Sequence, residues 1–381
     1  MKKKYLLAPG PTPVPPEVLS VMSEPIIHHR SPEFAAIMKD VLEGLKWLFQ
    51  TRKTVMALSA SGTGGMEAAV SNFFSPGDKA ICVRGGKFGE RWAEICEAYG
   101  LVPVNIDVRW GESVKPETIA NLLRQDPAIK AVFVQASETC SASVHPVKEI
   151  AEIVKGYENT ILVVDAITAI GVMDLPVDAW GIDICVTGSQ KALMLPPGMA
   201  FVSVSDKAWR FNESAKCPRF YFNLKKEKAK AEAGQTNFTS PVAMIIGLQR
   251  VLQMMQNEGL ENIFARHARL ADATRAAFRA LGLKLLAVDL PSNAVTGVYL
   301  PDGIDGGAFN KKLREDYGVT IAGGQAQLKG KIFRVAHLGY ADTLDVIVAL
   351  AAVERGLLHF GYNLELGTGV RAAEQVLYGQ N

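Results

Sequence analysis

Between about residues 54 and 205, short apolar runs rich in β-branched residues alternate with amphipathic segments of helical period. Parallel strands need a crossover connection, usually a helix, so this alternation predicts an α/β fold around a mostly parallel sheet that is covered on both faces. Ligands of such sheets bind beyond the carboxyl ends of the strands. We expect helices at 66–74, 89–99, 116–124 and 147–155, and seven strands: 54–59, 79–83, 101–106, 130–136, 160–165, 182–188 and 199–205.

The rest of the chain predicts a smaller α+β domain. Residues 225–232 form a charge run, which favours a solvated helix or a mobile loop. A long helix is expected over 242–256, and the segment after Gly361 gives no signal. Beyond residue 258 we expect helices at 262–281, near 307–317 and near 342–359, with the strand-like runs LKLLAV, VTGVYL and KIFRVA. The predicted division is an N-terminal arm (1–17), a large domain (18–257) and a small C-terminal domain (258–381).

Composition restricts partners and location. Lys and Arg number 41 against 39 Asp and Glu, a net charge of +2 that gives no reason to expect a nucleic-acid partner. No apolar run approaches the ~18–20 residues of a membrane span, and Pro9 interrupts the apolar start too early for a signal peptide. The five cysteines are scattered without a CxxC pair, which is typical of free thiols in the cytosol. We expect a cytoplasmic protein.

The loop ASGTGG connects a predicted strand to a predicted helix. A loop of small residues that opens a helix presents free backbone N–H groups and the positive end of the helix dipole, which favours an anion such as phosphate. No Lys-Ser/Thr pair completes a P-loop here, and the third glycine of a dinucleotide fingerprint is absent. The alternative interpretation is a flexible turn.

Two ionisable residues follow apolar strands. Asp165 ends TILVVD, where an unpaired carboxylate would be costly, so it either caps the next helix or faces a cation in a cleft. Lys191 follows IDICVTGSQ and precedes another apolar run. Desolvation there would lower its pKa and make the neutral amine available for a Schiff base, whereas the alternative is a surface lysine in a turn. An anion site, a strand-end acid and an amine together are what pyridoxal phosphate requires.

The chain resembles the class V aminotransferases of fold-type I, and within them the alanine–glyoxylate and serine–pyruvate aminotransferase group. The resemblance runs almost end to end, and the segment around Lys191 is its most specific part. The matching segments, in order, are APGPTPVPPEVL, HHRSPEF, SASGTGGMEAAV, GKFGERW, VVDAITAIG, TGSQKALMLPPG, TNFTSP and FRVAHLGY.

The resemblance implies a pyridoxal 5'-phosphate enzyme that moves an amino group from alanine or serine to glyoxylate or pyruvate by a ping-pong mechanism. Lys191 would form the Schiff base and shuttle the proton, and Asp165 would keep the pyridine nitrogen protonated. Phe88 would stack on the ring, with a core phenylalanine as the alternative. Thr139 would lie near the ring oxygen. The phosphate would be held by Ser61, Gly62 and Thr63, with Gln190 beside them.

The segment around Thr139 departs from the family pattern. It reads ETCSA where the family usually has ESSTG or ETSTG, so Cys140 and Ala142 alter the pocket or its substrate range. Arg334 matches the arginine that grips the substrate carboxylate, with its two parallel donors suited to that group. The segment GPTPVP, which begins at Gly10, is expected at the substrate side of the pocket. No metal is expected, since the histidines lack ligand spacing.

Thr239 matches a family hydroxyl that reaches the cofactor phosphate of the neighbouring subunit, which implies a homodimer with shared active sites. The alternative is a hydroxyl cap of the helix from Val242. Two other functions stay open. Cysteine desulfurase or β-elimination chemistry is disfavoured, because no cysteine follows Cys217 and Gln190 stands where desulfurases carry histidine. The second is a cofactor-bearing subunit of a redox complex, a label that some relatives carry. The sequence has no cysteine pairs that would support this function.

Overall fold

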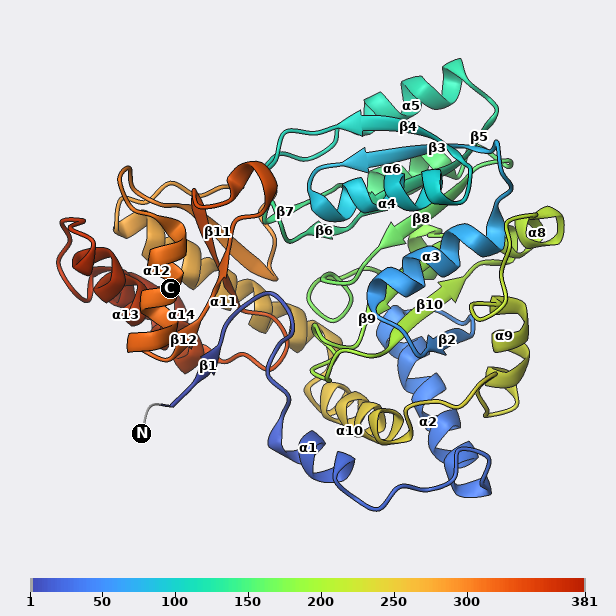
Figure 1. Ribbon diagram of the computed structural model, residues 1–381, viewed down its shortest axis with the longest axis horizontal. Coiled ribbons are helices and arrows are strands. Elements are labelled where there is room, and N and C mark those ends of the chain that lie inside the picture. Colours follow the sequence, from blue (N-terminus) through green and yellow to red (C-terminus); the bar gives the residue numbers. More distant parts are fainter. Residues whose placement is uncertain (1–2, 380–381) are drawn as a thin grey trace.

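The computed structural model describes residues 3–379, so the outermost residues of the predicted arm and of the predicted C-terminal domain (1–2 and 380–381) lie outside it. All seven predicted strands form, and they make one sheet with the order β2-β10-β9-β8-β5-β3-β4 (Figure 1). Their bounds are β2 (Val55–Leu58), β3 (Lys79–Arg84), β4 (Val102–Asp107), β5 (Ile129–Gln135), β8 (Ile161–Asp165), β9 (Ile184–Gly188) and β10 (Ala200–Val204).

The sheet is mostly parallel, as predicted. Only β10 is antiparallel, to both of its neighbours, and the other pairings are parallel. Successive strand residues face opposite layers: Val132 and Val134 pack on one side and Phe133 on the other, which explains the continuous apolar runs. One layer holds α3 (Gly62–Phe73) and α4 (Lys87–Ala98). The other holds α2 (Pro32–Phe49), α5 (Pro116–Gln125), α6 (Val147–Val154) and α10 (Val242–Glu258).

The C-terminal part has its own sheet and its own core. Strands β11 (Val295–Tyr299), β14 (Ile332–Ala336) and β13 (Ala322–Gly323) pair antiparallel in that order. Four helices accompany them: α11 (Leu260–Ala280), α12 (Gly306–Asp316), α13 (Thr343–His359) and α14 (Thr368–Tyr378). This is the smaller α+β part that the sequence predicts, whereas the boundaries at 17 and 257 stay predictions.

The N-terminal segment connects the two parts of the molecule. Strand β1 (Tyr5–Leu6) pairs in parallel with β12 (Val319–Thr320) in the C-terminal part. The chain then passes the carboxyl ends of the large sheet and forms α1 (Pro16–Met22), which packs beside α10 (Figure 1). The remaining elements are β6 (Ser137–Glu138), β7 (Ser143–Val144), α7 (Val177–Trp180), α8 (Asp206–Ser214), α9 (Leu224–Glu232) and a 3₁₀ turn (Ala326–Leu328).

Three segments differ from the expectations. The run LKLLAV makes only one bridge, between Leu285 and Val298, with a backbone hydrogen bond to β11 on either side of it, and its leucines are buried. The segment after Gly361 contains α14, whose buried Gly369, Ala373 and Leu377 follow a four-residue spacing against α11. The charge run is helix α9, and it has a narrow buried stripe: Leu224, Glu227 and Ala231.

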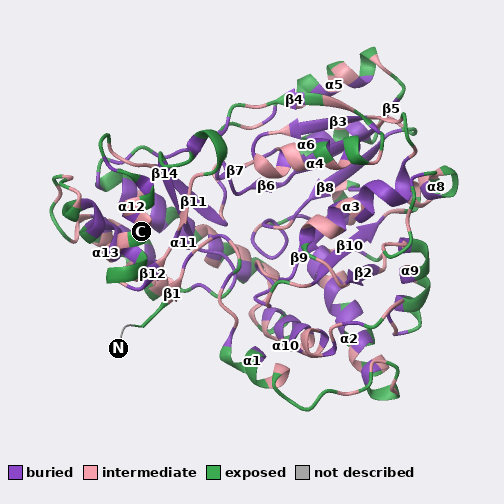
Figure 2. Cartoon of the chain, viewed as in Figure 1, coloured by how far each residue is buried: buried purple, intermediate pink, exposed green. Residues whose placement is uncertain are grey.

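Burial follows this layering. Figure 2 shows buried residues along the large sheet and exposed residues mainly on outer helices such as α5, α8 and α9. No helix formed by residues 3–379 combines the length and the apolar composition needed to cross a bilayer.

Candidate active site

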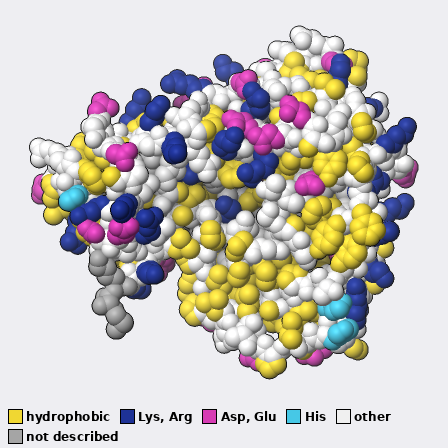
Figure 3. All heavy atoms as spheres, viewed as in Figure 1, with side chains coloured by type: hydrophobic (Ala, Val, Ile, Leu, Met, Phe, Trp, Pro, Cys, Tyr) yellow, Lys and Arg dark blue, Asp and Glu magenta, His cyan; other side chains and the backbone are white. Residues whose placement is uncertain are grey.

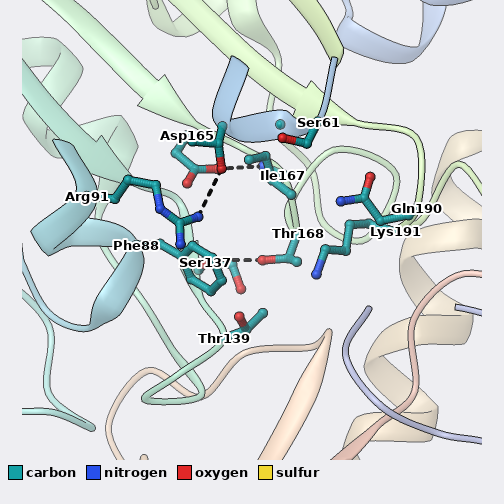
Figure 4. A pocket seen from close by; sticks show the side chains of 12 residues that line it. Ser61, Phe88, Arg91, Ser137, Thr139, Asp165, Ile167, Thr168, Gln190 and Lys191 are labelled. Carbon is teal, nitrogen blue, oxygen red and sulfur yellow. Dashed lines mark hydrogen bonds between the residues drawn. The ribbon is translucent and has the colours of Figure 1, made fainter. Parts of the chain in front are cut away.

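One pocket lies beyond the carboxyl ends of β5, β8 and β9, where the first turns of α3 and α4 meet them (Figure 4). Its empty volume is about 590 Å³, including its opening, which is within the usual range of small-molecule sites. Phe88 and Arg91 lie on one side of it, and Gln190 and Lys191 on the other. Eight residues predicted from the sequence line this pocket: Ser61, Gly62, Thr63, Phe88, Thr139, Asp165, Gln190 and Lys191.

Lys191 is enclosed by the N-terminal segment. Its Nζ donates a hydrogen bond of 2.8 Å to the carbonyl oxygen of Pro9. Burial lowers the pKa of the Lys191 amine to about 8, while the nearby Asp165 charge opposes this shift. A Cβ on Gly10 would lie 2.1 Å from Nζ, so a glycine is required there, and Gly10 has a φ of +150°. The structure thus places predicted Gly10 directly against the lysine.

Asp165 is the last residue of β8 and is buried. Its Oδ1 accepts the N–H of Ile167 at 2.9 Å, but a turn and not a helix follows, so the interpretation of Asp165 as a helix cap is wrong. The carboxyl group faces the pocket, and its pairing with a cation there stays a prediction. Desolvation raises the pKa of Asp165 to about 7; the charge of Glu138 adds to this effect, and a cation placed in the pocket would reverse it.

The first turn of α3 forms an anion cradle. Ser61 is the N-cap of α3, and its side chain makes no capping bond, so its hydroxyl and the first N–H groups of the helix can serve a ligand. The Oε1 of Gln190 is buried without a hydrogen-bond partner among the described residues. A Cβ on Gly188 would lie 3.1 Å from this oxygen, so glycine allows Gln190 and the backbone of Gly62 to approach each other. The Ser61 hydroxyl and the first N–H groups of α3 are donors that fit a phosphate group, and Gln190 could join them only through its amide NH₂ group.

Phe88 and Arg91 form the opposite wall. The Arg91 guanidinium lies 4.9 Å from the centroid of the Phe88 ring, and its Nη1 donates a 3.1 Å hydrogen bond to Thr63 Oγ1. Sequence reasoning missed Arg91, although it follows Phe88 by one helical turn in GKFGERW. Phe88 lines the pocket and also packs against a small apolar cluster that contains Trp110 and Leu286, and its stacking on a cofactor ring stays a prediction.

Two further hydroxyl residues were missed. Ser137 and Thr168 line the pocket, and Thr168 Oγ1 donates to the carbonyl of Ser137 at 2.9 Å. Ser137 follows the end of β5 and Thr168 follows the end of β8. Ligands of parallel sheets bind beyond the carboxyl ends of the strands, so this position was the available signal for both residues.

Arg334 lies on β14 behind Thr139 rather than in the pocket lining. Its Nη1 donates to the Thr139 carbonyl at 2.7 Å, and its Nε and Nη2 donate to the Gly323 carbonyl at 2.9 and 2.8 Å. A guanidinium has five N–H groups, so two stay available for a substrate carboxylate. In the ETCSA segment, Ala142 has a φ of 56°, a left-handed conformation that favours glycine.

Thr239 does not join the pocket of its own chain. It is exposed and lies in the segment that leads into α10. The N-cap of α10 is Pro241, without a side-chain capping bond, so the interpretation of Thr239 or Ser240 as a hydroxyl cap is wrong. The proline itself occupies the cap position. Arg30 holds this segment by donating to the Thr236 carbonyl at 2.6 Å.

Comparison with known proteins assigns the family. The family model described as aminotransferase class-V matches residues 4–338. This chain belongs to the class V aminotransferases. A "Serine--glyoxylate aminotransferase" of Hyphomicrobium methylovorum is 37% identical, covering 97% of this chain and 94% of its own. A "Soluble hydrogenase, small subunit" of Synechococcus is 44% identical, covering 98% of both chains.

The fold of a class V aminotransferase is confirmed by a solved structure. The ureidoglycine–glyoxylate aminotransferase of Bacillus subtilis superposes with a TM-score of 0.94 and 31% identity, covering 99% of this chain and 98% of its own. The enzyme class is therefore that of an aminotransferase with the fold-type I architecture. The predicted parallel sheet and smaller C-terminal part agree with it.

Proposed function

We propose that this aminotransferase binds pyridoxal 5'-phosphate and transfers an amino group from alanine or serine to glyoxylate or pyruvate in two half-reactions, by a ping-pong mechanism. The observation that supports it is the meeting of a buried amine, a strand-end carboxylate and an anion cradle in one pocket. When bound, the cofactor supplies an aldehyde for the amino group and a ring that accepts electrons. The amine, the carboxylate and the anion cradle are the three attachments that such a cofactor needs.

The residues then have defined tasks. Lys191 Nζ binds the cofactor covalently and, when free, moves a proton to and from the substrate carbon, because its lowered pKa keeps a fraction of the amine neutral near pH 7. Asp165 holds a proton at the ring nitrogen. The first N–H groups of α3, with the amide NH₂ of Gln190 beside them, would hold the phosphate. Phe88 stacks on the ring, Thr139 lies beside its oxygen, and Arg334 binds the substrate carboxylate.

The acceptor and donor can be identified by a half-reaction screen. The serine–glyoxylate and ureidoglycine–glyoxylate relatives share glyoxylate as an acceptor but differ in donor, which supports a small 2-oxo acid. Alanine, serine and aspartate should each be mixed with the protein loaded with pyridoxal phosphate while the loss of visible absorbance of the cofactor is followed. Rapid loss with alanine or serine supports the proposal. Loss with aspartate alone, or a purified protein that takes up no pyridoxal phosphate, would contradict it.

A subunit of a redox complex is the alternative that the name of the Synechococcus relative raises. Among residues 3–379, no three His, Cys, Asp or Glu side chains lie together in a way that could hold a metal ion. The meeting of Lys191, Asp165 and the α3 cradle in one pocket is what supports the transaminase. We also propose the cytoplasm as its location, in keeping with five buried cysteines in the free thiol form. The proposed domains are the arm (1–17), the large domain (18–257) and the small domain (258–381).

We further propose a homodimer whose active sites are shared. Thr239 is exposed, and its neighbour Phe238 stacks on Tyr221 at a centroid distance of 4.9 Å. Tyr221 and Phe220 are 47% and 79% exposed, which is unusual for aromatic side chains that face only water. Figure 3 shows hydrophobic side chains spread widely over one face of the molecule. A two-fold axis would let Thr239 reach the phosphate cradle of the partner.

Mixing two inactive variants is expected to restore activity if the sites are shared. Lys191→Ala removes the amine from one site, and Thr239→Arg places a bulky side chain at the other subunit's cradle. In the mixed dimer, one site receives both wild-type residues, so up to about half of the normal activity per hybrid returns. Steady-state assays after subunit exchange measure this. An active monomer by light scattering, or no recovery despite proven exchange, would refute the shared site.

The capture of pyridoxal phosphate by cofactor-free protein is expected to depend on pH with a midpoint near 8. Only the neutral Lys191 amine reacts, so the rate rises about tenfold per pH unit below that value and becomes constant above it. Stopped-flow absorbance measures the rate. In Asp165→Asn the anion that raises the Lys191 pKa is lost, so the midpoint should move to lower pH. A midpoint near 10 in the wild type would show a solvated lysine.

A further inference from the structure

Glu138 is a buried carboxylate beside the active site that the roles above leave without a task. It lies on β6, directly after the ligand edge of β5, and its exposed fraction is 0%. Its Oε2 accepts the backbone N–H groups of Phe88 and Gly89 at 3.0 and 3.1 Å, and its Oε1 accepts that of Cys140 at 3.0 Å. These three hydrogen bonds all come from backbone N–H groups, in two separate segments of the chain.

The first two of these groups belong to the first turn of α4. The N-cap of α4 is Gly86, which has no side chain to cap the helix, so Glu138 supplies the cap from a distant part of the chain. A Cβ on Gly86 would lie 2.4 Å from the Glu138 Cδ, which shows how closely the helix start and the carboxylate approach. This turn carries Phe88, and Arg91 follows within one helical turn.

The third group connects Glu138 to the substrate side. Cys140 N–H fixes the backbone on one side of Thr139, and the Thr139 carbonyl accepts Arg334 Nη1. The peptide that orients Arg334 is therefore held by the same carboxylate that orients the aromatic wall. Cys140 Sγ also donates to Gln325 Oε1 at 2.9 Å, which adds a second link between this loop and the C-terminal part.

We propose that Glu138 is a positioning residue that fixes Phe88 against the cofactor and Arg334 against the substrate carboxylate through one loop. The proposal rests on the proposed function and deepens it. It assigns no contact between Glu138 and either ligand. Instead, one carboxylate binds the first turn of α4, which carries Phe88, through one oxygen and the Thr139–Cys140 peptide, which holds Arg334, through the other.

Glu138→Gln tests this proposal. Glutamine has nearly the same shape, but one of its two terminal atoms is an NH₂ group that must face an N–H donor of either α4 or Cys140. The dissociation constant for pyridoxal phosphate and the KM for the amino donor should each rise about tenfold or more. The circular dichroism of the bound chromophore should change. In cofactor-free protein, amide exchange of Phe88 or of Cys140 should accelerate.

The chain offers a matched control in Glu354. This carboxylate is also buried, and it also accepts three backbone N–H groups, those of Gly367, Gly369 and Val370 at the start of α14. Glu354→Gln should lower stability to a similar degree and leave the cofactor affinity, KM and dichroism within about twofold of the wild type. Equal changes in both variants, or none in Glu138→Gln, would overturn the proposal.

Two further measurements keep the test decisive. If Glu138→Gln is not recovered as folded protein, Gly86→Ala replaces it, because the added methyl group must displace the carboxylate and should give the same signature. If the wild type binds no pyridoxal phosphate, the proposed function fails. The amide exchange of Phe88 and Cys140 in cofactor-free protein then still decides whether Glu138 holds the two segments.

Discussion

Replacing Lys191 by alanine is expected to lower transaminase turnover by on the order of 10⁴-fold, the upper range for losing a positioned proton-transfer group. The variant loses both the amine that holds the cofactor and the group that moves the substrate proton. The cradle at Ser61–Thr63 and Asp165 are untouched, so the cofactor should still bind non-covalently. Steady-state rates and the absorbance of the bound cofactor measure the two effects separately.

Lys191→Arg is the control for charge, because it keeps a cation but cannot supply a neutral amine at any ordinary pH. It should be as inactive as the alanine variant. Reduction of the wild type with borohydride, followed by peptide mapping, should find the cofactor attached to Lys191. An adduct on another lysine, or substantial turnover in either variant, would disprove the assignment.

Arg334→Ala is expected to weaken transition-state binding of amino donors by about 2–4 kcal/mol, with the cofactor still bound. The value of kcat/KM would then fall tens- to hundreds-fold. The substitution removes the donors for the substrate carboxylate and leaves the carbonyls of Thr139 and Gly323 without their present partner. Arg334→Lys keeps the charge but loses the parallel fork, so it should restore only part of the activity. Kinetics with alanine and with an amine lacking the carboxylate measure the loss.

Arg275 provides the comparison that separates binding from folding. It is also a buried arginine that donates to a backbone carbonyl, that of Ser292, at 3.1 Å. Arg275→Ala should lower the free energy of unfolding without a selective rise in the KM for the carboxylate substrate. If Arg334→Ala keeps the wild-type KM, or if both variants lose the same activity, another residue binds the carboxylate.

The large sheet was predictable because its strands are buried on both faces, which leaves an apolar run in the sequence for each. Asp165 and Lys191 were identifiable for the same reason, since an ionisable residue at the end of such a run stands out. LKLLAV is similarly apolar but forms only one bridge to β11, on the edge of β11 that does not pair with β14. Local pattern carries no information about which strand takes a partner.

Residues that act through distant contacts were the hardest to predict. The placement of Arg334 behind Thr139 depends on two carbonyls that are 184 residues apart (323 − 139) and meet only in the fold. Glu138 gave no signal, because a carboxylate held mainly by backbone N–H groups needs no oppositely charged residue in the sequence. Thr239 does not line the pocket of its own subunit, so its role at a partner's cofactor stays a proposal.

The pairing of β1 with β12 has a consequence for synthesis of the chain. Residues 5 and 6 are made 314 positions before their partners, Val319 and Thr320 (319 − 5). At roughly 5–20 residues per second, the arm waits on the order of 16–60 s for its partner strand. Until then, the contacts that can hold it beside Lys191 are local ones, such as the hydrogen bonds of Thr12 to the carbonyls of Gln190 and Lys191. We therefore expect the enclosure of Lys191 by Pro9 and Gly10 to be completed only after β12 has been made.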